Sequence, residues 1–117
     1  MAPIGSALNR TAAYDANEAA FLARLDELRA REKRVKLGGG QAALERLHQK
    51  GKLSARERIE LLVDPGSDFL EVGLFAAWEM YEDAGGAPAA GTVLGVGTIH
   101  GRETVIVAND ATVKAGA

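Results

Sequence analysis

The chain has 117 residues, with 14 Lys and Arg against 16 Asp and Glu, so its formal net charge is −2 with both His neutral. Its 47% hydrophobic and 26% charged residues are ordinary for a globular protein, and its length suits one small domain or part of a larger one. The absence of Cys excludes disulfides, thiolate metal sites and a cysteine nucleophile. The two His are too far apart for a helical metal pair, and no apolar stretch approaches the roughly 20 residues that span a bilayer.

Residues 1–14 are predicted to form an amino-terminal arm. Up to Arg10 the segment carries a single side-chain charge and no apolar run typical of a signal peptide, and it lacks the repeated Arg and Ser of an organelle transit peptide. We therefore expect a cytoplasmic, bacterial protein.

The charges are unevenly distributed. From Arg24 to Arg58 there are eleven Lys and Arg and five Asp and Glu, a local net of +6, and the rest of the chain is acidic. Such a basic half can be a nucleic-acid surface, a docking face for an acidic partner or a contact for cofactor phosphates. It can equally be a solvated helix face, and no aromatic residue lies among these charges to stack on a base. We expect no nucleic-acid partner and no membrane partner.

Residues 15–63 are predicted to be mainly helical. Asp15 can cap a first helix with Glu18 three residues later, and this helix should stop at Leu37 before the triplet Gly38-Gly39-Gly40. The helical period is carried by Phe21, Leu22, Leu25, Leu28 and Val35. A glycine triplet can also cradle a phosphate, although here it follows a helix rather than a strand.

Two shorter helices complete this segment. One covers residues 41–50 and ends before Gly51. The next opens with a capping box from Ser54 to Glu57 and continues to Val63, where Asp64-Pro65-Gly66-Ser67 predicts a turn.

The period changes after this turn. A short strand is predicted over residues 69–72, then an ambiguous apolar stretch to Tyr81 and a Gly- and Ala-rich loop over residues 83–91. Residues 92–109 predict a hairpin with His100-Gly101 at its tip. Gly95 and Gly97 indicate a bulge or a close backbone approach. Two strands with one buried side are marginal alone, so we expect the front part of a larger domain.

The ordered motifs resemble a known family. These are Gly38-Gly39-Gly40, residues 46–48, residues 51–59, residues 61–67 and residues 105–114. In this order they are similar to the amino-terminal region of the carboxyltransferase (β) subunits of biotin-dependent acyl-CoA carboxylases, from about Ala16 to the last residue. The final segment is more similar to the methylcrotonyl-CoA and geranyl-CoA branch than to the propionyl-CoA branch, although Ala115 stands where many methylcrotonyl-type members have Gly.

The resemblance implies an α/β fold. The chain would supply the leading helices and the first hairpin of a crotonase-like (ClpP/crotonase) carboxyltransferase domain, incomplete in this chain, with residues 64–117 as the start of its core. It also implies transfer of a carboxyl group from carboxybiotin to an acyl-CoA, with biotin carried on a partner α subunit and a β-subunit hexamer. In this family the oxyanion loops lie beyond the segment matching residue 117, so we expect the chain alone to be inactive. A non-catalytic subunit-docking module is the alternative.

The candidate site residues are few. Lys114 is a candidate contact for a CoA phosphate, as a point charge, and we expect no catalytic residue and no metal ligand in this segment. Asp110 should fix the loop after the hairpin through its own backbone N–H groups. His48 should make a local hydrogen bond on a helix surface, and His100 should be a turn residue.

Several other side chains have more than one possible role. Lys52, Arg56 and Arg58 could meet CoA phosphates or a partner subunit, or could be solvated. Trp78 and Tyr81 could anchor a subunit interface or pack in the core. The capping box explains Glu57 without a further role.

Overall fold

The computed structural model describes Gly5 and residues 9–116. Residues 1–31 and 32–117 form two compact units, which are described separately. Most of the predicted arm, residues 1–4 and 6–8, lies outside the described residues. No helix in the part that is described is long and apolar enough to cross a membrane.

The first unit consists mainly of helix α1 (Ala12–Lys36), whose last turn belongs to the second unit. The helix starts three residues before the predicted cap at Asp15, so that prediction was wrong. The Thr11 hydroxyl accepts the Tyr14 backbone N–H at 3.2 Å and acts as the cap, because it reaches an N–H that has no partner within the helix. Asp15 lies inside the first turn, where a carboxylate is favoured by the helix dipole.

Helices α2 (Gln41–Gln49) and α3 (Ala55–Leu62) follow in the second unit, close to their predicted bounds. The capping box of α3 is confirmed. Glu57 donates its backbone N–H to the Ser54 hydroxyl at 3.3 Å, and its carboxylate accepts the Ser54 N–H at 2.7 Å.

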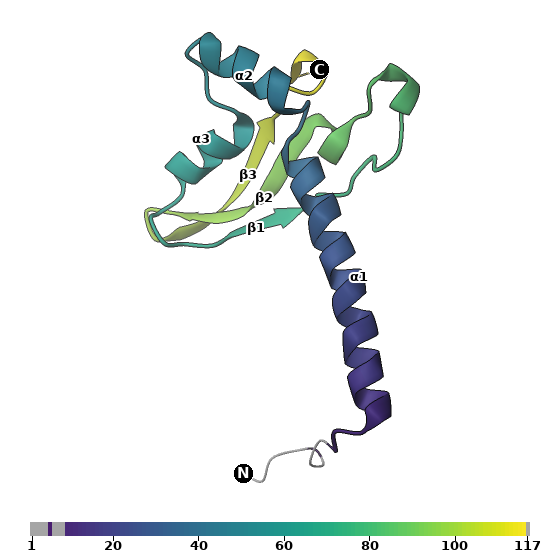
Figure 1. Ribbon diagram of the computed structural model, residues 1–117. Helices are drawn as coiled ribbons and strands as arrows, with labels where there is room; N and C mark the ends of the chain where they lie inside the picture. Colours follow the sequence, from purple (N-terminus) through teal and green to yellow (C-terminus); the bar gives the residue numbers. More distant parts are fainter. Residues whose placement is uncertain (1–4, 6–8, 117) are drawn as a thin grey trace. The chain divides into compact units, whose positions relative to one another are not determined.

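Strands β1 (Phe69–Val72), β2 (Thr92–Ile99) and β3 (Arg102–Asn109) form an antiparallel sheet in the order β1-β2-β3 (Figure 1). The predicted strand and hairpin are confirmed. Both tip residues, His100 (φ 50°) and Gly101 (φ 74°), have the positive φ that a two-residue I′ turn requires. Between β1 and β2 the chain forms turns and two 3-10 segments, Glu82–Ala84 and Pro88–Gly91.

The core lies between α3 and one face of the sheet. Ala55, Ile59, Val93 and Ile106 are buried together there, and Phe69 and Val63 pack against them. The predicted close approach at the strand glycines is confirmed. A Cβ on Gly95 would lie 2.4 Å from the Phe69 ring, and one on Gly97 would lie 2.7 Å from Val63. The β2–β3 register is continuous, so no bulge forms.

Candidate functional site

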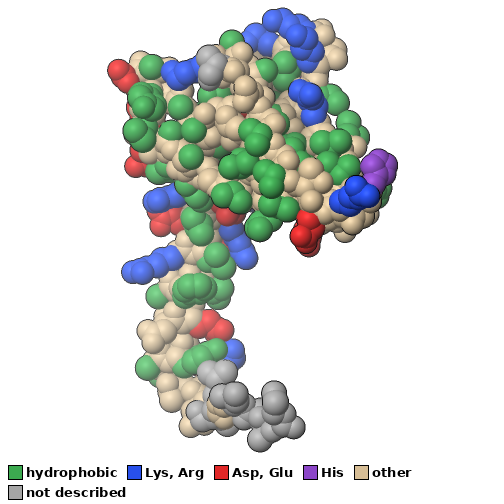
Figure 2. Space-filling view, turned by 180° about the vertical axis from the view of Figure 1, so that it is seen from behind, with side chains coloured by type: hydrophobic (Ala, Val, Ile, Leu, Met, Phe, Trp, Pro, Cys, Tyr) green, Lys and Arg blue, Asp and Glu red, His purple; other side chains and the backbone are tan. Residues whose placement is uncertain are grey.

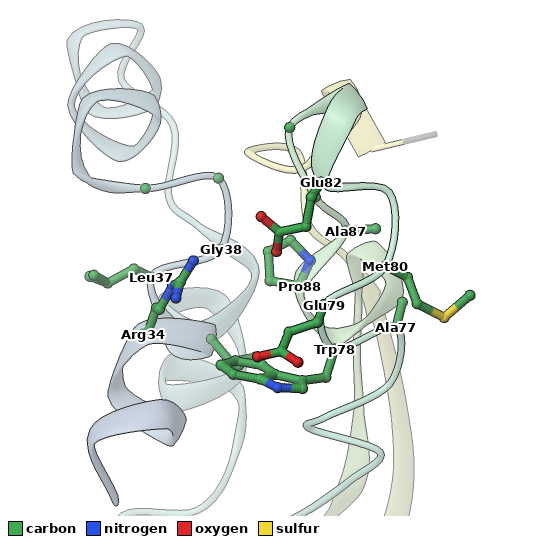
Figure 3. Close-up of a pocket in the computed structure, with 15 residues that line it drawn as sticks. Arg34, Leu37, Gly38, Ala77, Trp78, Glu79, Met80, Glu82, Ala87 and Pro88 are labelled. Carbon is green, nitrogen blue, oxygen red and sulfur yellow. The ribbon is translucent and has the colours of Figure 1, made fainter. Parts of the chain in front are cut away.

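A cleft in the second unit has a volume of about 280 Å³. One wall is the end of α1 and the glycine triplet, from Arg34 to Gly40, and the other is the turn segment Ala77–Pro88 (Figure 3). No local pattern joins these two segments, because more than thirty residues separate them in the chain.

Trp78 forms the floor of the cleft (Figure 3). Its ring meets Phe75 edge-on, with centroids 5.6 Å apart and planes at 81°. The Arg34 guanidinium lies 5.8 Å from the Trp78 ring centroid, within the range of a cation–π contact. This half-buried Trp78 joins the turn segment to α1, whereas Tyr81 is 57% exposed and lies outside the core.

Two carboxylates and one guanidinium give the cleft its polar character. Figure 3 shows the carboxylates of Glu79 and Glu82 and the Arg34 side chain around the opening. The sequence analysis did not select these three residues, because a single Glu or Arg on a helix or turn belongs to no recognisable motif. No group of three or more His, Asp or Glu side chains that could hold a metal ion occurs among the described residues.

The turn segment has an unusual backbone. Ala77, Glu79 and Tyr81 have φ values of 57°, 55° and 60°, in the left-handed region that favours glycine. Residues held in this way cost on the order of 1–3 kcal/mol each and persist where the surroundings enforce them. The packing around Trp78 and the hydrogen bond from Ala90 N–H to Ala76 O, 3.1 Å, supply part of that enforcement.

The loop after β3 is fastened to the glycine triplet. Asp110 is buried, and its carboxylate accepts the Thr112 N–H at 2.9 Å and the Thr112 hydroxyl at 2.6 Å, as predicted for a residue that fixes its own loop. The Thr112 hydroxyl in turn accepts the Gly39 N–H at 2.9 Å. The triplet therefore seats a protein loop, and a Cβ added at Gly38 or Gly39 would collide with Asp110 or Thr112.

Lys114 lies at the exposed end of this loop. Its Nζ donates to the carbonyl oxygen of Ala84 at 2.9 Å, which ties the loop to the turn segment that lines the cleft. The side chain thus stands beside the cleft without lining it. Its contact with a CoA phosphate stays a prediction.

The two His residues have local roles. His48 Nε2 lies 2.9 Å from a carboxylate oxygen of Glu57, which confirms the predicted surface hydrogen bond and links α2 to α3. The hydrogen bonds from His48 and from the Ser54 N–H lower the pKa of Glu57 from 4.5 to about 2.

The tip of the hairpin is held by Asp64. The backbone N–H groups of His100 and Gly101 each donate to the Asp64 carboxylate at 2.7 Å. These bonds, that of Gly101 first, hold the pKa of Asp64 below its ordinary value of 3.8. His100 is a turn residue, as predicted.

Arg56 is partly buried and paired with a carboxylate. Its two terminal nitrogens lie 2.5 and 2.7 Å from the two carboxylate oxygens of Glu71, a bidentate pair that joins α3 to β1. The exposed fractions of the two side chains are 24% and 12%. The sequence did not predict this pair for Arg56, whereas Lys52 and Arg58 are exposed.

Comparison with known proteins places the chain in a family. Residues 46–117 match the model of the carboxyl transferase domain. The chain belongs to the carboxyl transferase domain family. It is 45% identical over 104 residues, 89% of its length, to the mitochondrial methylcrotonoyl-CoA carboxylase beta chain of Arabidopsis thaliana. It is 52% identical over 80 residues, 68% of its length, to the biotin-dependent 3-methylcrotonyl-coenzyme A carboxylase beta1 subunit of Mycobacterium tuberculosis.

Solved structures of carboxyltransferases share the fold. The beta subunit of P. aeruginosa geranyl-CoA carboxylase matches 97% of the chain with a TM-score of 0.82 and 29% identity. A transcarboxylase 12S structure matches 80% of the chain with a TM-score of 0.72 and 38% identity. The α/β fold, with leading helices and the first hairpin of a carboxyltransferase domain, is confirmed. The chain spans only 17% and 15% of the two curated relatives and 21% of the geranyl-CoA carboxylase subunit.

Proposed function

We propose that this carboxyl transferase domain segment is the amino-terminal part of the carboxyltransferase subunit of a bacterial, cytoplasmic acyl-CoA carboxylase. The full subunit would transfer a carboxyl group from carboxybiotin, carried by an α subunit, to an acyl-CoA. The observation that carries this proposal is the 45% identity to a methylcrotonoyl-CoA carboxylase beta chain over 89% of the residues. The methylcrotonyl or geranyl type is favoured over the propionyl type.

The buried polar side chains of the described residues bond within the chain. These side chains are Ser54 and Asp110. The one buried side-chain nitrogen or oxygen without a partner in the described part is Arg56 Nε, and its guanidinium is committed to Glu71. We therefore assign no step of carboxyl transfer to these residues.

The contribution of this segment is structural. Helix α3 covers the first strands, and the glycine triplet seats the loop 110–116. In the full subunit this framework would set the path of the chain that leads from the first hairpin to the catalytic loops. Loops positioned by a rigid scaffold commonly carry binding and catalytic groups.

We propose that Lys114 supplies a positive charge to a CoA phosphate. The side chain is exposed, and its ammonium group has two further protons available beyond the bond to Ala84 O. Titration of CoA into the chain at low salt should show weak binding that Lys114→Met reduces and that rising salt weakens. Lys50→Met is the matched control, because Lys50 is an exposed lysine at the end of α2 and is not a candidate contact for CoA. Equal loss in both variants would contradict a specific contact.

The subunit assignment is tested with a chimera. The matched 80-residue segment of the mycobacterial beta1 subunit is replaced by the corresponding residues of this chain, to which it is 52% identical. The chimera, combined with its biotin-carrying partner, should retain carboxylation of methylcrotonyl-CoA in preference to propionyl-CoA. A soluble, correctly assembled chimera without carboxylase activity would contradict the proposal.

A docking module without catalysis is the second candidate. It is favoured by one observation, the exposed aliphatic face that the sheet presents opposite α3.

A further inference from the structure

Loop 110–116 is fastened at two points, one on each wall of the cleft. At the first point the Gly39 N–H donates to the Thr112 hydroxyl at 2.9 Å, and at the second Lys114 Nζ donates to the Ala84 carbonyl oxygen at 2.9 Å. Gly39 lines one wall, and Ala84 belongs to the turn segment that forms the other. Thr112 and Lys114, two residues apart in the chain, therefore tie the loop to both walls.

The backbone at Lys114 is held in an unfavourable conformation. Lys114 and Ala115 have φ values of 45° and 57°, so two successive residues other than glycine lie in the left-handed region. Such a conformation persists where surrounding contacts enforce it. Just before it, the Val113 N–H donates to the Asp110 carbonyl oxygen at 3.0 Å, and the Val113 side chain is buried. The contacts that hold this backbone therefore include those of the residues on the amino-terminal side of Lys114.

The Thr112 hydroxyl links this loop to the glycine triplet. It donates to a carboxylate oxygen of Asp110 at 2.6 Å and accepts the Gly39 N–H, so its single proton is used and its oxygen is also an acceptor. Asp110 is buried, and hydrogen bonds to a carboxylate are roughly twice as strong as neutral ones. Valine resembles threonine in shape but can form neither bond, whereas serine can form both.

Positive charge by itself does not distinguish Lys114 from other side chains. Figure 2 shows Lys and Arg side chains at several separate places on one side of the globular part. A lysine carries its charge at the end of a flexible four-carbon stem. The place of the Lys114 charge therefore depends on how its backbone and its ammonium group are held.

We propose that Thr112 is the positioning residue for Lys114. Its hydroxyl holds loop 110–116 on the glycine triplet, and this hold keeps the Lys114 ammonium group at the Ala84 carbonyl oxygen, beside the cleft. The effect of this placement on CoA binding rests on the proposed function, whereas the placement itself does not. A side chain that is ordered before its ligand arrives binds more tightly, because less freedom is lost on binding.

Competitive acetylation measures the placement of the Lys114 ammonium group. The full 117-residue chain is treated with limiting acetic anhydride under native conditions, and mass spectrometry compares Lys114 with the exposed Lys50 of the same chain. In the wild-type chain Lys114 should react more slowly than Lys50, since its ammonium group is hydrogen-bonded. Thr112→Val should raise the ratio of the Lys114 rate to the Lys50 rate about two- to tenfold, the factor that corresponds to one lost hydrogen bond.

Two variants serve as controls for the acetylation ratio. Thr112→Ser should keep the wild-type ratio, because serine retains the hydroxyl. Thr104→Val makes the same chemical change as Thr112→Val in β3, where the Thr104 hydroxyl donates to the Arg102 carbonyl oxygen at 3.1 Å, and it should also keep the ratio. A wild-type Lys114 that reacts as fast as Lys50, or a ratio that Thr112→Val leaves unchanged, overturns the proposal.

A double-mutant cycle on CoA binding tests the consequence of the placement. Lys114→Met should weaken CoA binding in the wild-type chain and should have no further effect in Thr112→Val, because the displaced charge no longer meets the phosphate. Independent, additive losses would overturn the proposal. If the chain binds no CoA and Thr112→Val still raises the acetylation ratio, Thr112 positions Lys114 and the proposed contact between Lys114 and a CoA phosphate is wrong.

Discussion

Gly39 is the position where one added methyl group should have the largest effect on the second unit. A Cβ built there would lie 1.9 Å from the carbonyl oxygen of Thr112 and 2.6 Å from its carbonyl carbon. The obstacle is backbone, which cannot rotate away as a side chain can. Gly39 is not among the residues with positive φ, so Gly39→Ala adds a steric clash without backbone strain.

The magnitude follows from the two contacts that must change. Ordinary van der Waals contact begins at 3.4 Å, so the loop 110–116 or the triplet must shift by more than an ångström. Overpacking of this kind costs about 1–3 kcal/mol. The shift also breaks the hydrogen bond from Gly39 N–H to Thr112 Oγ1, 2.9 Å long, worth about 0.5–1.5 kcal/mol. We expect Gly39→Ala to lower the free energy of unfolding by about 2–4 kcal/mol.

The assay is urea denaturation followed by circular dichroism, together with tryptic cleavage after Lys114. Release of the loop should speed cleavage at Lys114 before global unfolding, since local opening exposes it. Gly51→Ala is the control, because Gly51 has φ of 68° with no atom within 4 Å of a built Cβ. That variant carries only the left-handed penalty of about 1–2 kcal/mol and should not affect Lys114. Equal unfolding free energies and equal cleavage rates in the two variants would refute the reasoning.

Two further predictions concern charged groups. Glu71→Ala leaves the Arg56 guanidinium half-buried without its bidentate partner and should lower the free energy of unfolding by about 1–3 kcal/mol. Glu60→Ala is the control and should change urea denaturation little, because Glu60 is exposed on α3. Similar denaturation midpoints for the two variants would contradict a stabilising role of the Arg56–Glu71 pair. The pKa of Glu57 is lowered from 4.5 to about 2, so its contribution to stability is fully present above pH 4.5 and is lost as pH falls toward 2. The melting temperature should fall less between pH 5 and pH 2 in Glu57→Gln than in the wild-type chain. An equal fall in both proteins would contradict a contribution of the ionised Glu57 to stability.

Features that depend on neighbouring residues were predictable from the sequence. The capping box from Ser54 to Glu57 joins groups three residues apart, and the His100-Gly101 turn needs only two residues with positive φ. Both form as predicted because their hydrogen bonds or dihedral requirements lie within one turn. The cap of α1 was misplaced by four residues because Thr11 and Asp15 both carry side chains that can cap, and only geometry shows which one reaches an N–H.

The partners of the predicted residues were decided by the tertiary structure. Nothing local distinguishes a glycine triplet that binds phosphate from one that seats the loop at Thr112, 73 residues away. Arg56 meets Glu71 because α3 packs across β1, and Trp78 meets Arg34 because the turn segment folds back to the end of α1. Local patterns in the sequence were enough to predict that three helices, a strand and a hairpin form and, through ordered motifs, to indicate the family. The cleft and the seat of the loop could not be predicted, because they depend on which surfaces far apart in the sequence pack together and exclude water.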